Sequence, residues 1–179
     1  MRLFVALPLP EPVEDALWEL CSGISHARWT LPDQFHLTLR FLGEVSPAQR
    51  QDVEEALAAV QVAPFALSLR GVGHFPPRGR ARVLWAGVEP SEPLARLQQQ
   101  VERQLVRVGL APEPRKYHAH VTLARLDRVS EAQVAEFLAT HGLFRQAAWT
   151  VDEFCLYSSL LRDDGADHHI ESRFALQAT

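Results

Sequence analysis

Residues 36–49 read HLTLRFLGEVSPAQ, and residues 120–133 read HVTLARLDRVSEAQ. The two segments align without a gap at an offset of 84, and eight of their fourteen positions are identical. About one identity is expected by chance in a window of this length, given ordinary residue frequencies. We therefore predict that the chain contains one structural unit used twice.

Each copy begins with the alternation of polar and apolar residues that is typical of a half-buried strand. In the first copy one predicted face carries Phe35, Leu37, Leu39 and Phe41, and the other carries His36, Thr38 and Arg40. In the second copy the corresponding sets are Tyr117, Ala119, Val121 and Leu123 against Lys116, His118, His120 and Thr122. Because successive side chains of a strand point to opposite faces, each motif histidine should share a face with the threonine two residues later.

A turn and a helix start follow each predicted strand. Ser46-Pro47-Ala48-Gln49 and Ser130-Glu131-Ala132-Gln133 both have the spacing of a capping box. Further helices are predicted near 11–21 and 92–108, and strands near 65–73, 81–88, 149–158 and 168–176. The sequence therefore predicts an α+β fold: one two-lobed, pseudo-twofold domain over 1–179, with largely antiparallel sheets lining a central cleft and helices outside.

Composition favours one globular domain and excludes several other classes of protein. The chain has 179 residues, of which 47% are hydrophobic and 22% charged, as expected for one globular domain. Its apolar stretches are too short to span a membrane, and we interpret residues 2–7 as a first strand, not a signal peptide. Two cysteines favour a reducing cytoplasm over a disulfide scaffold. The net charge of −4 excludes a protein that holds nucleic acid through an overall basic field.

The paired motifs predict a chemistry. A pseudo-twofold arrangement would bring two histidines and two threonines around one cleft. Splitting a phosphodiester requires a base for the attacking oxygen and an acid for the departing one, and two histidines supply both near neutral pH. The threonine hydroxyls of Thr38 and Thr122 suit the non-bridging phosphoryl oxygens, where charge builds in the transition state. This scheme needs neither a metal nor another cofactor.

The sequence resembles the two-histidine phosphoesterases, specifically the RNA 2′,3′-cyclic phosphodiesterases that are also called 2′-5′ RNA ligases. The likeness covers most of the chain and rests on five segments: RLFVA at 2–6, HLTLRFLGEV at 36–45, RVLWAGV at 82–88, HAHVTLAR at 118–125 and VDEFCLYSS at 151–159. One departure is Ala119, where members of the family often have proline.

The resemblance implies hydrolysis of a terminal 2′,3′-cyclic phosphate to a 2′-phosphate, with reversible 2′-5′ joining of RNA ends as a weaker activity. It implies that His36 protonates the departing 3′ oxygen and that His120 activates water, although nothing in two near-symmetric motifs distinguishes the acid from the base. It also implies that Arg125 contacts the phosphate. The expected partners are cyclic-ended RNA or cyclic nucleotides, and the expected state is a monomer.

Two arginines are candidates for substrate binding on their own grounds. Arg40 should share the face of His36 and Thr38 and meet a phosphate there, although a solvated arginine is equally consistent with the pattern. Strict alternation places Arg125 opposite Thr122, so it reaches the site only if a bulge or the strand end intervenes. Lys116 and His118 are expected at the rim of the cleft.

Other interpretations of the same residues stay open at this level. His118 and His120 have the spacing of a zinc pair, with His36 as a third ligand. The chain is alternatively a non-catalytic module that holds an RNA end, or a phosphodiesterase of another small cyclic phosphate. The loop at 74–82 contains Arg78, Arg80 and Arg82, which suit an RNA strand as well as a solvated hairpin. His168 and His169 look like the entry to a strand.

Overall fold

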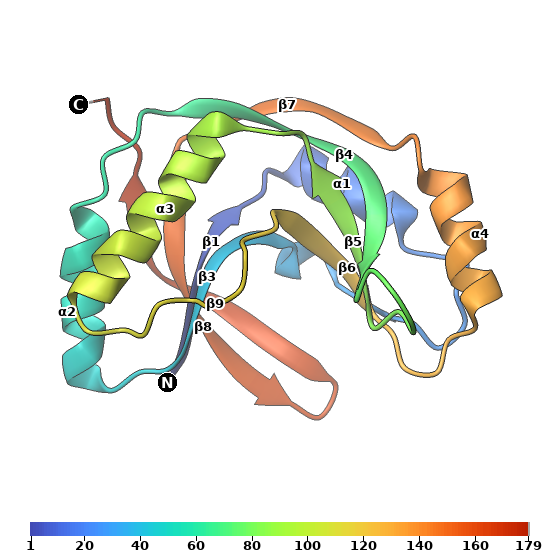
Figure 1. Cartoon of the computed structure of the whole chain (residues 1–179), viewed down its shortest axis with the longest axis horizontal. Helices are drawn as coiled ribbons and strands as arrows, with labels where there is room; N and C mark the ends of the chain where they lie inside the picture. Colours follow the sequence, from blue (N-terminus) through green and yellow to red (C-terminus); the bar gives the residue numbers. More distant parts are fainter. Residues whose placement is uncertain (179) are drawn as a thin grey trace.

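A computed structural model describes residues 1–178 of the chain (Figure 1). Its α-helices are α1 (Glu11–Leu20), α2 (Pro47–Ala58), α3 (Glu92–Arg107) and α4 (Glu131–His141), and Pro32–Gln34 forms a short 3-10 helix, η1. Its strands are β1 (Arg2–Pro8), β2 (Arg28–Trp29), β3 (His36–Glu44), β4 (Phe65–Phe75), β5 (Val83–Val88), β6 (His120–Arg125), β7 (Arg145–Val151), β8 (Glu153–Arg162) and β9 (Gly165–Ala175). The predicted α+β class is confirmed.

All strands belong to one antiparallel sheet, where we expected more than one. The order across it is β7-β4-β5-β6-β3-β1-β8-β9, and the short β2 pairs with β6 off this path. The two motif strands, β3 and β6, are therefore neighbours at the centre, and three strands flank them on each side. This placement agrees with a pseudo-twofold relation between the halves, although descent by duplication stays a prediction.

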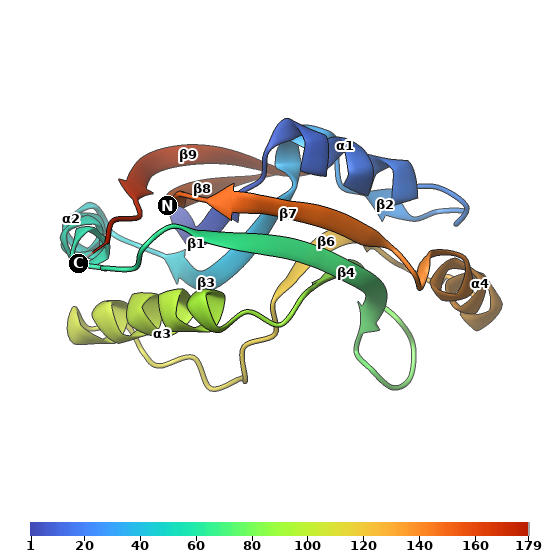
Figure 2. The same cartoon turned by 90° about the horizontal axis from the view of Figure 1, so that it is seen from above.

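The sheet curls strongly, and the link between β7 and β8 shows why. We predicted one strand over 149–158, which is wrong: Asp152 separates β7 from β8, and these strands pair with β4 and β1 in opposite halves of the sheet. A single residue can join them only because the sheet bends far enough to bring its two halves together, and β7 arches across the molecule to make this connection (Figures 1 and 2).

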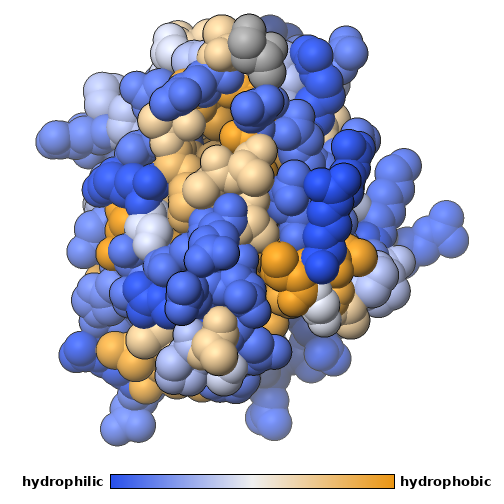
Figure 3. All heavy atoms as spheres, turned by 90° about the vertical axis from the view of Figure 1, so that its left-hand side faces the viewer, coloured by the Kyte–Doolittle hydropathy of each residue, from blue (hydrophilic) through white to orange (hydrophobic). Residues whose placement is uncertain are grey.

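The core lies on one face of the sheet. From β1, Leu3, Val5 and Leu7 point into it, and each is at most 2% exposed. Amphipathic α3 contributes Leu97, Val101 and Leu105 to the same cluster. Helices α2 and α3 lie side by side at one end of the molecule and α4 lies at the other (Figure 1). Viewed from the α2 and α3 end, the surface is mainly hydrophilic around a central apolar strip (Figure 3).

The predicted helix starts are confirmed. Ser46 accepts a hydrogen bond from the Gln49 backbone N–H, and the Gln49 side chain accepts one from the Ser46 backbone N–H, which completes a capping box. Ser130 accepts the equivalent bond from the Gln133 backbone N–H. Within the described residues, no helix is both long and apolar enough to span a bilayer.

Candidate active site

The pairing of the two motif strands brings the predicted residues together. Leu37 lies opposite Val121 in the antiparallel register of β3 and β6, and both are fully buried on the core side. The neighbouring residues therefore point to the other face of the sheet. Counting one residue each way from this pair places His36 beside Thr122, and Thr38 beside His120. Each histidine thus lies next to the threonine of the other motif.

The two histidines are oriented by equivalent hydrogen bonds. Nδ1 of His36 lies 2.8 Å from the Gln34 carbonyl oxygen, and Nδ1 of His120 lies 2.7 Å from the His118 carbonyl oxygen. A carbonyl oxygen only accepts, so Nδ1 carries the proton in both rings. When either ring is neutral, its Nε2 is consequently the nitrogen with a lone pair for proton transfer.

Partial burial disfavours the protonated, charged form of both rings. It lowers the pKa of His36 to about 4, against the hydrogen bond to Gln34, and the nearby charges of His168 and His120 lower it further. Burial also lowers the pKa of His120, where the hydrogen bond to His118 opposes it. Without a ligand both imidazoles are therefore neutral at pH 7.

A bulge at the same position of each motif reverses the strand faces beyond it. Thr38 pairs with Ala6 and Arg40 pairs with Val5, so Leu39 is an extra residue in β3. Likewise Thr122 pairs with Trp85 and Ala124 pairs with Leu84, which makes Leu123 an extra residue in β6. Leu39 and Leu123 are equivalent in the sequence repeat. Both motifs therefore have the same irregular strand.

The bulge corrects the prediction for Arg40. Instead of sharing a face with His36, Arg40 shares the core face with Val5, is 8% exposed, and forms an ion pair with Glu102 of α3. Its guanidinium also donates to the carbonyls of Phe41 and Ala111. Strict alternation gave the wrong face because it did not allow for Leu39. Arg40 consequently holds α3, and the loop after it at Ala111, to the sheet and lies outside the site.

The same shift moves Phe41 onto the site face, although the sequence predicted it on the opposite face with Leu37 and Leu39. Phe41 is 59% exposed, and its ring centroid lies 5.8 Å from that of Phe4, which in turn lies 4.9 Å from His36. Arg125 is the residue equivalent to Phe41 in the second motif. It pairs with Val83, on the same face as Trp85 and Thr122, so the bulge that Arg125 required is present.

Two hydroxyl groups brace the motif backbones at the bulges. Tyr117 Oη donates to the Thr38 carbonyl over 2.8 Å, and Thr30 Oγ1 donates to the Thr122 carbonyl over 3.1 Å. The Thr30 backbone N–H also donates to the Leu123 carbonyl over 2.8 Å. Neither Tyr117 nor Thr30 was identified from the sequence as a supporting residue, because each comes from a segment far from the threonine that it holds.

His168 is a further residue that the sequence analysis missed. Its ring lies edge-on to His36 at 5.1 Å between centroids, and its buried Nδ1 has no hydrogen-bond partner among the residues that the structure describes. Its backbone N–H donates to Gln34 Oε1, so Gln34 holds both histidines. Burial lowers the pKa of His168, Asp167 raises it, and the charges of Arg125 and His169 lower it. His118 packs instead against Trp85 and Phe75 near His120.

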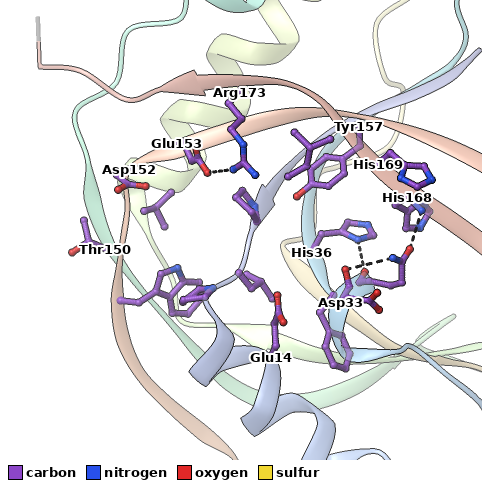
Figure 4. A pocket seen from close by; sticks show the side chains of 18 residues that line it. Glu14, Asp33, His36, Thr150, Asp152, Glu153, Tyr157, His168, His169 and Arg173 are labelled. Atoms are coloured by element: carbon purple, nitrogen blue, oxygen red, sulfur yellow. Dashed lines mark hydrogen bonds and ion pairs between the residues drawn. The ribbon is translucent and has the colours of Figure 1, made fainter.

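A cavity of about 700 Å³ adjoins His36 (Figure 4). His36, Tyr157 and His168 line one side of it, and the Glu153–Arg173 ion pair lies across from them (Figure 4). Four carboxylates line the cavity in all: Glu14, Asp33, Asp152 and the ion-paired Glu153. Burial raises the pKa of Glu14, as do the charges of Asp33, Glu11 and Asp15. An excess of carboxylates makes this cavity a poor place for a phosphate.

The zinc alternative required His36 to join His118 and His120. Within residues 1–178, no three histidine, cysteine, aspartate or glutamate side chains are grouped so that they would hold a metal ion. The rings of His118 and His120 lie 6.2 Å apart between centroids. His120 takes part in the arrangement around Thr38 described above, and its orientation is set by a carbonyl group.

Comparison with known proteins places this arrangement in a family. The sequence matches the 2′-5′ RNA ligase superfamily over residues 13–163, which include both motifs. The chain belongs to this superfamily. An RNA 2′,3′-cyclic phosphodiesterase of Archaeoglobus fulgidus is 36% identical over 169 residues, which cover 92% of this chain and 94% of that protein.

Solved structures of the superfamily share the whole fold. A protein of Thermus thermophilus superposes with a TM-score of 0.82 at 31% identity, over 99% of both chains. E. coli LigT in complex with 3′-AMP superposes with a TM-score of 0.81 at 28% identity, over 98% of this chain and 97% of LigT. The chain thus shares its overall fold with both solved structures.

Proposed function

We propose that this protein hydrolyses the 2′,3′-cyclic phosphate at the end of an RNA chain to a 2′-phosphate. The observation that carries the proposal is the alternating set His36, Thr122, Thr38 and His120 on one sheet face, with each histidine held at Nδ1 by a carbonyl group. The likeness to proteins named RNA 2′,3′-cyclic phosphodiesterase supports this substrate. Arg125, on the same face, supplies a cation for the phosphate.

The reaction is a displacement at phosphorus. One histidine accepts a proton at Nε2 from water as the water oxygen bonds to phosphorus, and the other donates a proton from Nε2 to O3′ as the phosphorus–O3′ bond breaks. The products are a 2′-phosphate and a free 3′-hydroxyl. Thr38 and Thr122 lie between the two rings, where their hydroxyls donate to the phosphoryl oxygens as negative charge develops. We assign the donating role to His36, as the resemblance of the sequence implies.

Substrate binding supplies the protonated histidine that the reaction needs. Because burial lowers the pKa of both histidines, the unliganded site holds neither as an acid at pH 7. A phosphate anion between the rings favours the protonated form of one of them, since an opposite charge within a few ångströms raises the pKa of an imidazole. The acid is thus formed as the substrate binds.

The same geometry accommodates 2′-5′ joining. A 5′-hydroxyl from a second RNA end then takes the place of water, and its oxygen bonds to phosphorus while the bond to O3′ breaks. The name of the superfamily to which the chain belongs is the observation that favours this second activity. Water is far more abundant than RNA ends, so we expect hydrolysis to dominate.

Product analysis in the presence of excess EDTA tests the proposal. The substrate is a short RNA that ends in a 2′,3′-cyclic phosphate, and the products are separated as 2′- and 3′-phosphates. We expect the 2′-phosphate alone, at a rate that EDTA does not change. A rate that EDTA abolishes and zinc restores would favour the metal alternative. Binding of the RNA without turnover would favour a non-catalytic module. Turnover of small cyclic phosphates alone would favour a phosphodiesterase of another small cyclic phosphate.

A further inference from the structure

Unpaired arginines gather beside the active-site face. Arg125 ends β6, Arg28 lies in β2 directly opposite it, and Arg82 immediately precedes β5, where its carbonyl accepts the Leu126 N–H. The β4–β5 loop adds Arg78 and Arg80. No ion pair within residues 1–178 involves any of these five guanidinium groups. We call this set the arginine track.

The pairing of Arg28 with Arg125 points to an anion. Like charges directly opposite each other on neighbouring strands destabilise a sheet unless something neutralises them. The chain contains a second such pair, Arg70 opposite Arg145, and there Glu89 forms an ion pair with Arg70. Within residues 1–178, no carboxylate forms an ion pair with Arg28 or Arg125. Asp127 is the nearest acid along the chain, and it forms none of the ion pairs within the described residues.

Two residues of the track, Arg28 and Arg125, lie on the active-site face. Trp29 pairs with the buried Ala124 and its ring packs against Phe137 of α4, so Arg28, one residue earlier, points to the opposite, active-site face with Arg125. The charge of Arg125 lowers the pKa of His168, whose ring lies edge-on to His36 at 5.1 Å between centroids. Phe75, where the β4–β5 loop begins, lies edge-on to His120 at 5.0 Å between ring centroids, so the loop that carries Arg78 and Arg80 also adjoins the site.

The cavity on the other side of His36 is negatively charged, unlike the arginine track. The 700 Å³ cavity beyond His36 carries four carboxylates against one arginine. A phosphodiester backbone is repelled there, whereas the arginine track attracts it. The distribution of charge around the site thus defines a single direction for a long anionic substrate, although the chain as a whole has a net charge of −4.

We propose that the arginine track binds the phosphates of a single-stranded RNA on the 5′ side of its cyclic phosphate, so that the enzyme prefers oligonucleotide ends to cyclic mononucleotides. This proposal rests on the proposed function for its catalytic consequence. The binding itself does not depend on turnover. Guanidinium groups are suited to phosphate because they are always charged and present several donors in one plane.

Arg28 and Arg80 are the residues to test, because both are exposed and neither belongs to the catalytic set. The double variant Arg28→Gln, Arg80→Gln is compared with wild type on 2′,3′-cyclic AMP and on a cyclic-ended RNA of about ten nucleotides. We expect KM for the oligonucleotide to rise about tenfold or more, while kcat and KM for cyclic AMP stay unchanged. Each phosphate contact that is lost should reduce the slope of log affinity against log salt by about 0.7.

Direct binding separates this proposal from the proposed function. Anisotropy of a labelled single-stranded RNA with an ordinary 3′-hydroxyl end reports the track even if no turnover occurs. Arg103→Gln is the matched control, because Arg103 is exposed on α3 and in no ion pair within residues 1–178; we expect it to bind like wild type. Unchanged binding and salt slope in the double variant would overturn the track. So would equal losses on both substrates, or tighter binding of duplex than of single-stranded RNA.

Discussion

At the residue scale, the site is built from two histidines that are fixed at one nitrogen and available at the other. The carbonyls of Gln34 and His118 lie two residues before the rings that they hold, so each motif orients its own histidine. The threonine beside each ring comes from the other motif. A change in one motif therefore disturbs both halves of the site.

The threonines provide the first prediction. We expect Thr38→Ala and Thr122→Ala each to lower kcat for a cyclic-ended RNA about 100-fold, because one hydroxyl donor to the developing charge is lost. Thr38→Ser and Thr122→Ser keep the hydroxyl and should recover most of the rate. Steady-state kinetics of the four variants make the comparison. If the serine variants were as slow as the alanine variants, the methyl group and not the hydroxyl would be the important feature.

The histidines predict an unusual pH dependence. The pH profile of kcat/KM reports the free enzyme, in which burial lowers the pKa of both His36 and His120 below the ordinary value near 6.5. The reaction needs one protonated ring, so kcat/KM should fall as pH rises and its descending limb should lie below pH 6.5. The same limb of kcat should lie at higher pH, because bound phosphate favours the protonated ring. A descending limb of kcat/KM above pH 7 would contradict this account.

At the element scale, the bulges at Leu39 and Leu123 determine which residues reach the site. They turn Arg40 inward to Glu102 and turn Phe41 and Arg125 outward. The backbone at each bulge is held by a hydroxyl group from elsewhere in the chain, Tyr117 in one case and Thr30 in the other. Strand pairing and these two hydrogen bonds together fix the direction of Thr38 and Thr122.

We predict that Tyr117→Phe weakens the site without destroying the fold. Loss of the hydrogen bond from Tyr117 to the Thr38 carbonyl should lower the free energy of unfolding by about 1 kcal/mol. It should also lower kcat several-fold while KM changes little, because Thr38 is then less well oriented in the transition state. Urea denaturation and steady-state kinetics measure the two effects. Loss of stability with an unchanged kcat would show that Tyr117 supports the fold alone.

The sequence predicted the elements well where local patterns determine them. The motif strands, the helix starts at Ser46 and Ser130, and α1 and α3 all follow from alternation, helical spacing and capping residues. It failed where pairing with a distant strand decides. The alternation through Leu39 to Phe41 continues unbroken in the sequence, and only the register against β1 reveals the bulge. Likewise, the contact of His168 with His36 depends on β9 folding back beside the site.

At the scale of the whole molecule, one curled sheet carries both motifs and brings opposite charges to the two sides of the site. The cavity beyond His36 is acidic, and the arginine track beyond Arg125 is basic. The continuous sheet also means that the fold itself packs the partly buried ring of His36 against Phe4 and Tyr157. Protonation of His36 is therefore linked to the stability of the entire domain.

This linkage predicts that stability falls in mild acid. The pKa of His36 is about 4 in the folded protein and near 6.5 when unfolded, so the unfolded state binds more protons between these values. The contribution of His36 is fully present above pH 6.5 and is lost as pH falls toward 4. His36→Gln removes the titrating group and should flatten the dependence of the unfolding free energy on pH in this window. An equally steep dependence in the variant would show that other groups cause it.

Paired-histidine catalysis is tested most directly by the rate of cyclic-ended RNA hydrolysis in His36→Ala, His120→Ala and the double variant, with His26→Asn as an exposed control. We predict that each single variant loses at least 100-fold in kcat, that the double variant is little slower than either, and that the control is unaffected, because two groups that act in one step are lost together. A single variant that keeps a rate within a few-fold of wild type would contradict the account.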